Sequence, residues 1–203
     1  MEEGKKVVKS PVDAEELREI RLGETFYLDG LLLAARDKVH ERTVLQRRPL
    51  PLDARGLAVI HAGPIIVERE GSLVCLSLGS TTSVRFENLI PKFVELTGVR
   101  LVIGKGGVSR RVSESLSALG AIYAVYPGGL GALGATSVKK VLLSFWEDLG
   151  PAESAWLLEV KELGPLIAAT DLKGGNLIED VLDLARAILL SKRVRSKPEV
   201  SSR

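Results

Sequence analysis

The chain has 203 residues, of which 45% are hydrophobic, 27% charged and 4% aromatic, and its formal net charge is +2. This composition is that of a globular domain with a sizeable core, and the mixed charges give no reason to expect a nucleic-acid-binding protein. No run reaches the roughly 18 apolar residues of a membrane span, and residues 1–6 lack the apolar segment of a secretory signal, so we expect a cytoplasmic protein.

The first half of the chain is predicted to be rich in strands. A helix is expected from Ser10–Pro11 to about Ile20, because Ser followed by Pro is a common helix start. Asp29–Gly30 has the composition of a tight turn. A second helix carries Arg36 to Arg42, and a proline-rich loop follows over 47–55. The expected strands are 25–28, 31–35, 57–62 and the two arms of a hairpin, 65–70 and 73–78.

The second half alternates helices with strands. The expected helices are 84–96, 109–119 and 178–190, and the expected strands are 101–103, 121–126, 141–146, 156–160 and 167–171. A small-residue segment fills 128–140. We therefore predict one domain over residues 7–190, an α/β fold with an added β layer, followed by a basic, disordered tail over 191–203.

Cysteine and histidine are scarce. Cys75 is the only cysteine, and His40 and His61 are the only histidines, so neither a disulfide nor a cysteine-rich metal site can form within the chain. His61 ends an apolar strand and is interpreted as structural. Without a G-x-S-x-G motif a hydrolase is poorly supported. The chemistry must rest on Arg, Lys, Ser, Thr and carboxylates, or be completed by a partner. Scarce amides beside abundant charge also suggest a thermophilic source.

The segment Gly79-Ser80-Thr81-Thr82-Ser83-Val84-Arg85 is the most informative in the chain. Hydroxyl side chains at the start of a helix cap its free N–H groups, and the same groups attract anions. An arginine one turn later offers a planar fork that can hold a carboxylate with two hydrogen bonds. The simpler interpretation is a capped helix with an arginine in solvent.

Two further cationic segments interrupt the apolar sequence. In the first, Asp37 could orient Arg36 toward a substrate carboxylate, with His40 on the same helical face; a solvated ion pair is the alternative. The second, Gly104-Lys105-Gly106-Gly107, lacks the spacing of a P-loop. It can still bind an anion, or it can be a glycine turn with an exposed lysine.

The segment Gly129–Gly134 matches the dinucleotide-binding pattern G-x-G-x-x-G after an apolar strand, with Glu147 and Asp148 following at about the expected distance. The unit is too short, because the next strand begins near Val141. We favour close packing of a small-residue helix and keep an NAD-dependent oxidoreductase as an alternative.

Taken in order, these segments resemble one family. The matching pieces are Gly30, Ala35-Arg36-Asp37-x-x-His40-x-Arg42, Ala62-Gly63-Pro64, Gly79-x-Thr81-Thr82-Ser83-x-Arg85, Gly104-Lys105-Gly106-Gly107, Gly128-Gly129, Trp146-Glu147-Asp148-Leu149-Gly150, Trp156, Glu159-Val160, Asp171 and Gly175-Asn176. The chain resembles the β subunit, or C-terminal domain, of class I iron–sulfur fumarate hydratases and L-tartrate dehydratases. The usual proline before the threonine pair is replaced by Ser80, and Leu130-Gly131-Ala132 departs from the usual run of alanines.

The resemblance implies a three-layer swivelling β/β/α domain and a 4Fe–4S cluster held by the α subunit, not by this chain. Arg36 and Arg85 would bind substrate carboxylates, Lys105 would add positive charge, and Thr81 would lie at the carbon that loses its proton. Asp37, His40 and Thr82 would support them. A hydroxyl is a poor base, so Thr81 would need a carboxylate from the α subunit.

The leading hypothesis is the β subunit of a fumarate hydratase in a hetero-oligomer, reversibly hydrating fumarate to L-malate and inactive without its α subunit. The main alternative is L-tartrate dehydratase, which converts tartrate to oxaloacetate. A binding module for small dicarboxylates is a third interpretation, besides the NAD-dependent oxidoreductase.

Overall fold

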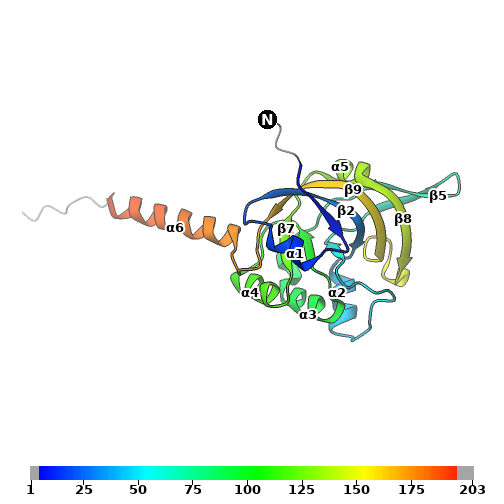
Figure 1. Ribbon diagram of the computed structural model, residues 1–203, viewed down its shortest axis with the longest axis horizontal. Helices are drawn as coiled ribbons and strands as arrows, with labels where there is room; N and C mark the ends of the chain where they lie inside the picture. Colours follow the sequence, from blue (N-terminus) through cyan, green and yellow to red (C-terminus); the bar gives the residue numbers. More distant parts are fainter. Residues whose placement is uncertain (1–4, 196–203) are drawn as a thin grey trace, which may run out of the picture.

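The computed structural model describes residues 5–195 and shows a mixed α/β domain from which one helix projects (Figure 1). In chain order the elements are β1 (Val7–Ser10), α1 (Ala14–Arg18), β2 (Thr25–Ala34), α2 (Asp37–Val44), β3 (Ala58–Ile60), β4 (Ile65–Arg69), β5 (Ser72–Ser77), the 3-10 helix η1 (Ser83–Leu89), α3 (Ile90–Thr97), β6 (Leu101–Gly104), α4 (Arg110–Ala118), β7 (Ile122–Val125), α5 (Gly131–Ser137), β8 (Val138–Phe145), η2 (Glu147–Leu149), β9 (Ala155–Ala168) and α6 (Leu177–Arg195). Among these residues no helix is both long and apolar enough to cross a membrane.

The main sheet has the strand order β1-β2-β3-β6-β7-β9-β8, and β2 also pairs with β9. The pairings of β2, β3, β6, β7 and β9 therefore close into a ring. β1, β2, β3, β6 and β7 are parallel to one another, whereas β9 runs antiparallel to β2, β7 and β8. The expected α/β class is confirmed, and the swivelling three-layer arrangement stays a prediction.

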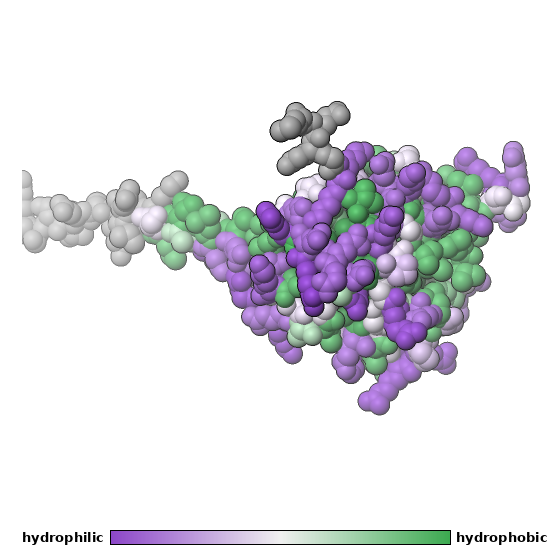
Figure 2. Space-filling model, in the orientation of Figure 1, coloured by the Kyte–Doolittle hydropathy of each residue, from purple (hydrophilic) through white to green (hydrophobic). Residues whose placement is uncertain are grey.

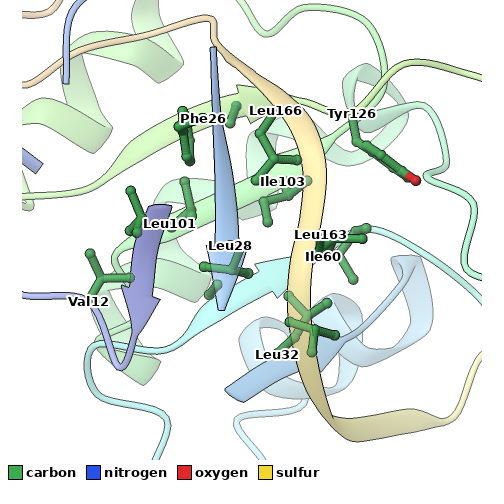
Figure 3. Packing of buried hydrophobic residues seen from close by; sticks show 14 of the residues in the cluster. Val12, Phe26, Leu28, Leu32, Ile60, Leu101, Ile103, Tyr126, Leu163 and Leu166 are labelled. Carbon is green, nitrogen blue, oxygen red and sulfur yellow. The ribbon is translucent and has the colours of Figure 1, made fainter. Parts of the chain in front are cut away.

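Two apolar cores lie on opposite faces of the parallel strands. Because side chains alternate along a strand, Ile60 and Ile103 join the core inside the ring, where β9 contributes Leu163 (Figure 3). Val59 and Val102 point to the other face and pack against the helices. Fully burying one such side chain stabilises the fold by about 2 kcal/mol, so this double burial fixes the ends of β3 and β6.

Helices α2, α3 and α4 cover the second face of the parallel strands (Figure 1). Val39 of α2, Phe93 of α3 and Val112 of α4 all belong to the core on that face. The hairpin of β4 and β5 forms a separate sheet of two strands, as its sequence predicts. The hairpin begins shortly after β3 and ends shortly before η1. Its ends therefore adjoin Ala62-Gly63-Pro64 on one side and Gly79–Arg85 on the other.

Two pairs of predicted strands are each a single strand. The turn expected at Asp29–Gly30 is wrong, because β2 continues through it; a register shift between Leu28 and Gly30 accommodates the glycine. Gly30 has φ +97°, and a Cβ there would lie 2.2 Å from the carbonyl oxygen of Ser10. Strands predicted at 156–160 and 167–171 likewise join in β9, which ends at Ala168.

Several predicted helix boundaries also differ from the structure. Ser10 ends β1 and does not cap α1; the cap is Asp13, whose carboxylate accepts from the N–H of Glu15 at 3.0 Å. The single helix expected over 84–96 is η1 followed by α3, with a kink at Phe86. α6 continues to Arg195, so residues 191–195 of the expected tail are helical. Residues 196–203 of that tail lie outside the described residues.

Candidate functional site

The hydroxyl segment fits between the ends of two parallel strands. β3 and β6 stay paired up to the bond from the N–H of His61 to the carbonyl of Ile103, at 2.8 Å. Beyond it the strands separate. The N–H of Thr81 donates to the carbonyl of His61 at 2.6 Å, and the N–H of Lys105 donates to the carbonyl of Thr81 at 3.1 Å. Ser83 closes the arrangement by donating to Lys105 at 3.2 Å. Thr81 and Lys105 are thereby held side by side.

We call the place where residues 81–83 lie between His61 and Lys105 the seam. Next to it, side chains in contact form a row made of Arg36, Asp37, Arg85 and Thr81. Arg85 Nη2 donates to Thr81 Oγ1 at 2.7 Å and lies 3.8 Å from Asp37 Oδ1. The same Asp37 oxygen lies 3.6 Å from Arg36 Nε. Asp37 therefore sits between the two guanidinium groups, at distances longer than a hydrogen bond. The structure brings four of the predicted residues into contact from two segments far apart in the sequence.

Glu153 is the residue that sequence reasoning missed. Its Oε1 lies 3.0 Å from Arg36 Nη2, and its Oε2 accepts from the N–H of Lys38 at 3.3 Å. Glu153, with a side chain 22% exposed, thus fixes both Arg36 and the first turn of α2. Nothing in its local sequence distinguishes it from a surface carboxylate. Its position between the matched segments ending at Gly150 and starting at Trp156 was the available clue.

The site has more positive than negative charge. Three cationic side chains face two carboxylates, Asp37 and Glu153. Within the described part of the chain, no carboxylate oxygen lies within 4 Å of the Lys105 ammonium. The Arg85 side chain is 50% exposed, so it can turn toward a ligand at little cost. An anion at this edge would find cationic donors that are not fully neutralised.

Two glycines of the matched segments make room for these cations. A Cβ on Gly63 would lie 2.4 Å from the carbonyl oxygen of Ala152 and 3.0 Å from Arg36 Cδ. A Cβ on Gly128 would lie 3.2 Å from Lys105 Cδ. Each glycine therefore allows a close approach of the cationic side chain, or of the loop behind it, that a larger residue would obstruct.

His40 supports the site from inside the core. It is fully buried, its Nδ1 lies 3.0 Å from the carbonyl oxygen of Arg36, and its ring stacks on Phe93 at 4.0 Å. Burial lowers the pKa of His40 to about 4, so the ring is neutral at pH 7. The expected shared helical face with Arg36 is wrong, because Arg36 has extended backbone at the N-cap of α2.

The hydroxyl side chains anchor the segment in a different way from the one expected. Thr82 occupies the N-cap of η1 without a side-chain cap bond, so the predicted capping role is wrong for this residue; its backbone bridges to Lys105 instead. Ser80 Oγ donates to the carbonyl of Tyr126 at 2.8 Å. This bond ties the segment to β7's end, so Ser80 restrains it by another route than a proline would.

The geometry around Gly129–Gly134 does not favour a dinucleotide site. α5 has seven residues, and the strand after it, β8, pairs with β9 in an antiparallel manner and not with β7. A dinucleotide fingerprint needs a parallel strand–helix–strand unit. Tight packing of a small-residue helix is what the structure shows: a Cβ on Gly134 would lie 2.3 Å from the carbonyl oxygen of Leu78.

Among residues 5–195, no three His, Cys, Asp or Glu side chains are grouped so as to hold a metal ion. Cys75 packs against the core inside the ring, where burial raises the pKa of its thiol. The donors available in this chain therefore do not fit an iron–sulfur cluster, which needs several thiolates.

Comparisons with known proteins give the family. A model of the family described as Fumarase C-terminus matches residues 2–181. The chain is 41% identical over 176 residues to the L(+)-tartrate dehydratase subunit beta of Escherichia coli (strain K12), covering 87% of this chain and 88% of that one. It is 36% identical over 171 residues to a putative L(+)-tartrate dehydratase subunit beta of Methanocaldococcus jannaschii, covering 82% and 88%.

A putative class I fumarate hydratase of Geobacillus stearothermophilus is 28% identical over 175 residues, a match that covers 86% of this chain but 34% of that protein. In this relative the matching region is thus about a third of a longer chain. The resemblance carried by the short motifs is confirmed: the chain belongs to the Fumarase C-terminus family.

Proposed function

We propose that this chain is the β subunit of a hydro-lyase that acts on a four-carbon dicarboxylate. The observation that carries the proposal is the contact of Arg36, Asp37, Arg85 and Thr81, beside Lys105, on one edge of a Fumarase C-terminus domain. The relatives are named for hydro-lyases, tartrate dehydratase and fumarate hydratase, whose substrates have two carboxylates. This edge offers cations for both carboxylates.

In the proposed role the two arginines and the lysine bind the substrate carboxylates. Glu153 fixes Arg36 in place at 3.0 Å, so its guanidinium loses little freedom on binding. Within the part of the chain that the structure describes, Arg85 is held by Thr81 and by a loose approach to Asp37. We expect a substrate carboxylate to replace that loose approach, which turns Arg85 from a contact within the chain into a contact with substrate.

Dehydration of a 2-hydroxy acid removes a proton from the carbon next to a carboxylate. Negative charge then grows on that carboxylate, and fixed cationic donors stabilise the transition state more than the ground state. In the proposal Thr81 lies at the reacting carbon. Because a neutral hydroxyl is a weak base, a base from the partner subunit takes the proton of the Thr81 hydroxyl while the Thr81 oxygen accepts the proton of the carbon. The guanidinium of Arg85, 2.7 Å from the Thr81 oxygen, stabilises negative charge on that oxygen as its own proton leaves.

The partner subunit is part of the proposal. Two of the relatives are named as β subunits, and in a third the matching region is one part of a longer chain. We assign the expected 4Fe–4S cluster to an α subunit, and when bound it would supply a Lewis acid for the leaving hydroxyl. This chain contributes binding, charge and the position of Thr81. A cytoplasmic location stays a prediction.

Two substrates are consistent with the site. The sequence hypothesis names fumarate and L-malate, whereas the relatives with 41% and 36% identity are named tartrate dehydratases. L-Tartrate differs from L-malate by one more hydroxyl, which needs a hydrogen-bonding partner. Among these two, the comparisons favour L-tartrate, and fumarate is the second candidate.

The test is anaerobic co-expression with an α-type subunit that carries the three cluster cysteines, taken from the neighbouring reading frame if that frame encodes one. Dehydration of L-tartrate and hydration of fumarate are then measured side by side. We expect one of the two reactions from the complex and neither from the isolated chain. A complex with an intact cluster that turns over neither substrate would contradict the proposal.

A further inference from the structure

A buried chain of hydrogen bonds lies directly beneath the seam that holds Thr81 and Lys105. Ser83 Oγ lies 2.8 Å from Nδ1 of His61 and 2.9 Å from the hydroxyl of Tyr123. The same tyrosine hydroxyl lies 3.1 Å from the carbonyl oxygen of Gly106. His61, Ser83 and Tyr123 all have zero exposure. This buried hydrogen-bond chain therefore connects the end of β3, the hydroxyl segment and the loop after β6 without help from solvent.

The position of this chain coincides with the separation of β3 and β6. His61, the residue directly after β3, still donates its N–H to the carbonyl of Ile103, and Ser83 follows the inserted residues Thr81 and Thr82. Tyr123 reaches the gap from β7 on the far side of β6. The three side chains thus fill the space that opens where the two strands part, and they set how far apart the strands stay.

Gly104 shows how closely the strands fit against the buried hydrogen-bond chain of His61, Ser83 and Tyr123. A Cβ on this residue would lie 1.9 Å from Ser83 Oγ, 2.7 Å from the Tyr123 hydroxyl and 3.1 Å from Nδ1 of His61. The buried hydrogen-bond chain therefore occupies the space that a side chain at this position of β6 would fill, next to Lys105. Any change in its length would move the backbone of Lys105 relative to that of Thr81.

We infer that Tyr123, Ser83 and His61 are positioning residues, which act through the backbone of Thr81 and Lys105 and do not touch substrate. The inference rests on the proposed function for its catalytic consequence, but the positioning itself is a property of this chain. It explains why these three polar groups are buried together, where each would be costly without its partners.

The test compares Tyr123→Phe with Tyr126→Phe. Both tyrosines are fully buried, and among the described residues the Tyr126 hydroxyl hydrogen-bonds only to the carbonyl of Leu130, at 3.1 Å. Each variant loses one buried hydroxyl, so the two should lose similar thermal stability. We expect amide hydrogen exchange at Thr81 and Lys105 to become at least about ten-fold faster in Tyr123→Phe only. Ser83→Ala should resemble Tyr123→Phe.

In the assembled enzyme, Tyr123→Phe should lower kcat by about ten-fold or more, since small misplacements of reacting groups are costly, while Tyr126→Phe keeps kcat within about two-fold. Unchanged exchange at Thr81 and Lys105 in Tyr123→Phe would overturn the inference, whatever the activity. Faster exchange together with an inactive wild-type complex would leave the inference standing and refute the proposed function. Faster exchange with an unchanged kcat would refute the catalytic consequence.

Discussion

At the scale of single residues, the site depends on how each cation is held. Arg36 is fixed by Glu153, whereas among the described residues Arg85 is held by one hydrogen bond to Thr81. The backbone bonds of Lys105 to the hydroxyl segment fix its main chain but not its ammonium group. Fixed donors favour a transition state because they need no reorganisation, whereas a mobile donor must first be ordered. Of the two arginines, we therefore expect Arg85 to change its geometry more on ligand binding.

The first prediction concerns Arg85. Arg85→Ala should lower kcat/KM of the assembled enzyme by about 100-fold or more, the usual loss when a charge-assisted donor is removed from a reacting centre. Arg111→Ala is the matched control, since Arg111 is an exposed arginine on α4, and it should leave kcat/KM unchanged. Equal effects of the two substitutions would remove Arg85 from the site.

The second prediction concerns the buried histidines and pH. Burial lowers the pKa of His40 to about 4 and that of His61 well below its ordinary value. Below pH ~6.5 the unfolded chain takes up protons that the folded chain refuses, so the free energy of unfolding falls as pH decreases from about 6.5 toward 4. Each histidine contributes a slope of about 1.4 kcal/mol per pH unit.

Denaturant unfolding measured between pH 7 and pH 4.5 checks this prediction. His40→Phe removes one titrating group and keeps an aromatic ring among Phe86 and Phe93. The variant should show a pH slope smaller than that of the wild type by about one proton. A slope that is the same in both proteins would mean that His40 is not the group responsible.

At the scale of elements, the ends of β2, β3 and β6 position the residues of the site. β2 runs unbroken from Thr25 to Ala34 and delivers Arg36 to the edge where β3 and β6 end. Arg42 of α2 donates to Asp148 at 2.8 Å, and its guanidinium lies over the ring of Trp146, 5.4 Å from the ring centroid. These contacts hold the loop that brings Glu153 to Arg36, which gives the W-E-D-L-G segment a structural role next to the site.

The third prediction concerns Gly30, which lets β2 pass close to β1. Gly30→Ala should lower the free energy of unfolding by more than about 3 kcal/mol, because it adds a clash with the backbone of Ser10 to the strain of a positive φ. Gly71→Ala isolates the strain alone: Gly71 has φ +75° and its Cβ would meet nothing within 4 Å. It should cost only about 1–2 kcal/mol. Similar losses in the two variants would contradict the role given to the close approach.

At the scale of the whole molecule, α6 stands apart from the domain. It projects from the body (Figure 1), and the part visible in Figure 2 is largely hydrophobic. Its exposed large apolar residues are Val181, Leu182, Leu184, Ile188, Leu189 and Leu190. Among the described side chains of α6, Ile178 in the first turn is the one that packs against the core, and the match to the family ends at residue 181. The domain therefore gains little stability from most of this helix.

The fourth prediction follows from that arrangement. A chain ending at Leu184 should keep the wild-type melting temperature within about 2 °C, since little buried surface is lost. A chain ending at Asn176 also lacks Ile178, which packs beneath Gly107, and its melting temperature should fall by at least about 5 °C. Thermal unfolding followed by circular dichroism distinguishes the two. A large loss in the longer chain would show that the outer part of α6 stabilises the domain.

The sequence by itself determined the family, the α/β class and the hairpin of β4 and β5, because glycines, hydroxyl residues and cations recur at spacings set by local backbone needs. It also identified Arg36, Thr81, Arg85 and Lys105 as candidates. Only the tertiary structure decided that β2 is continuous, because the approach of Gly30 to Ser10 joins residues far apart in sequence. In the same way it alone revealed Glu153 beside Arg36, and the buried chain under the seam, since partners across a fold leave no local pattern in the sequence.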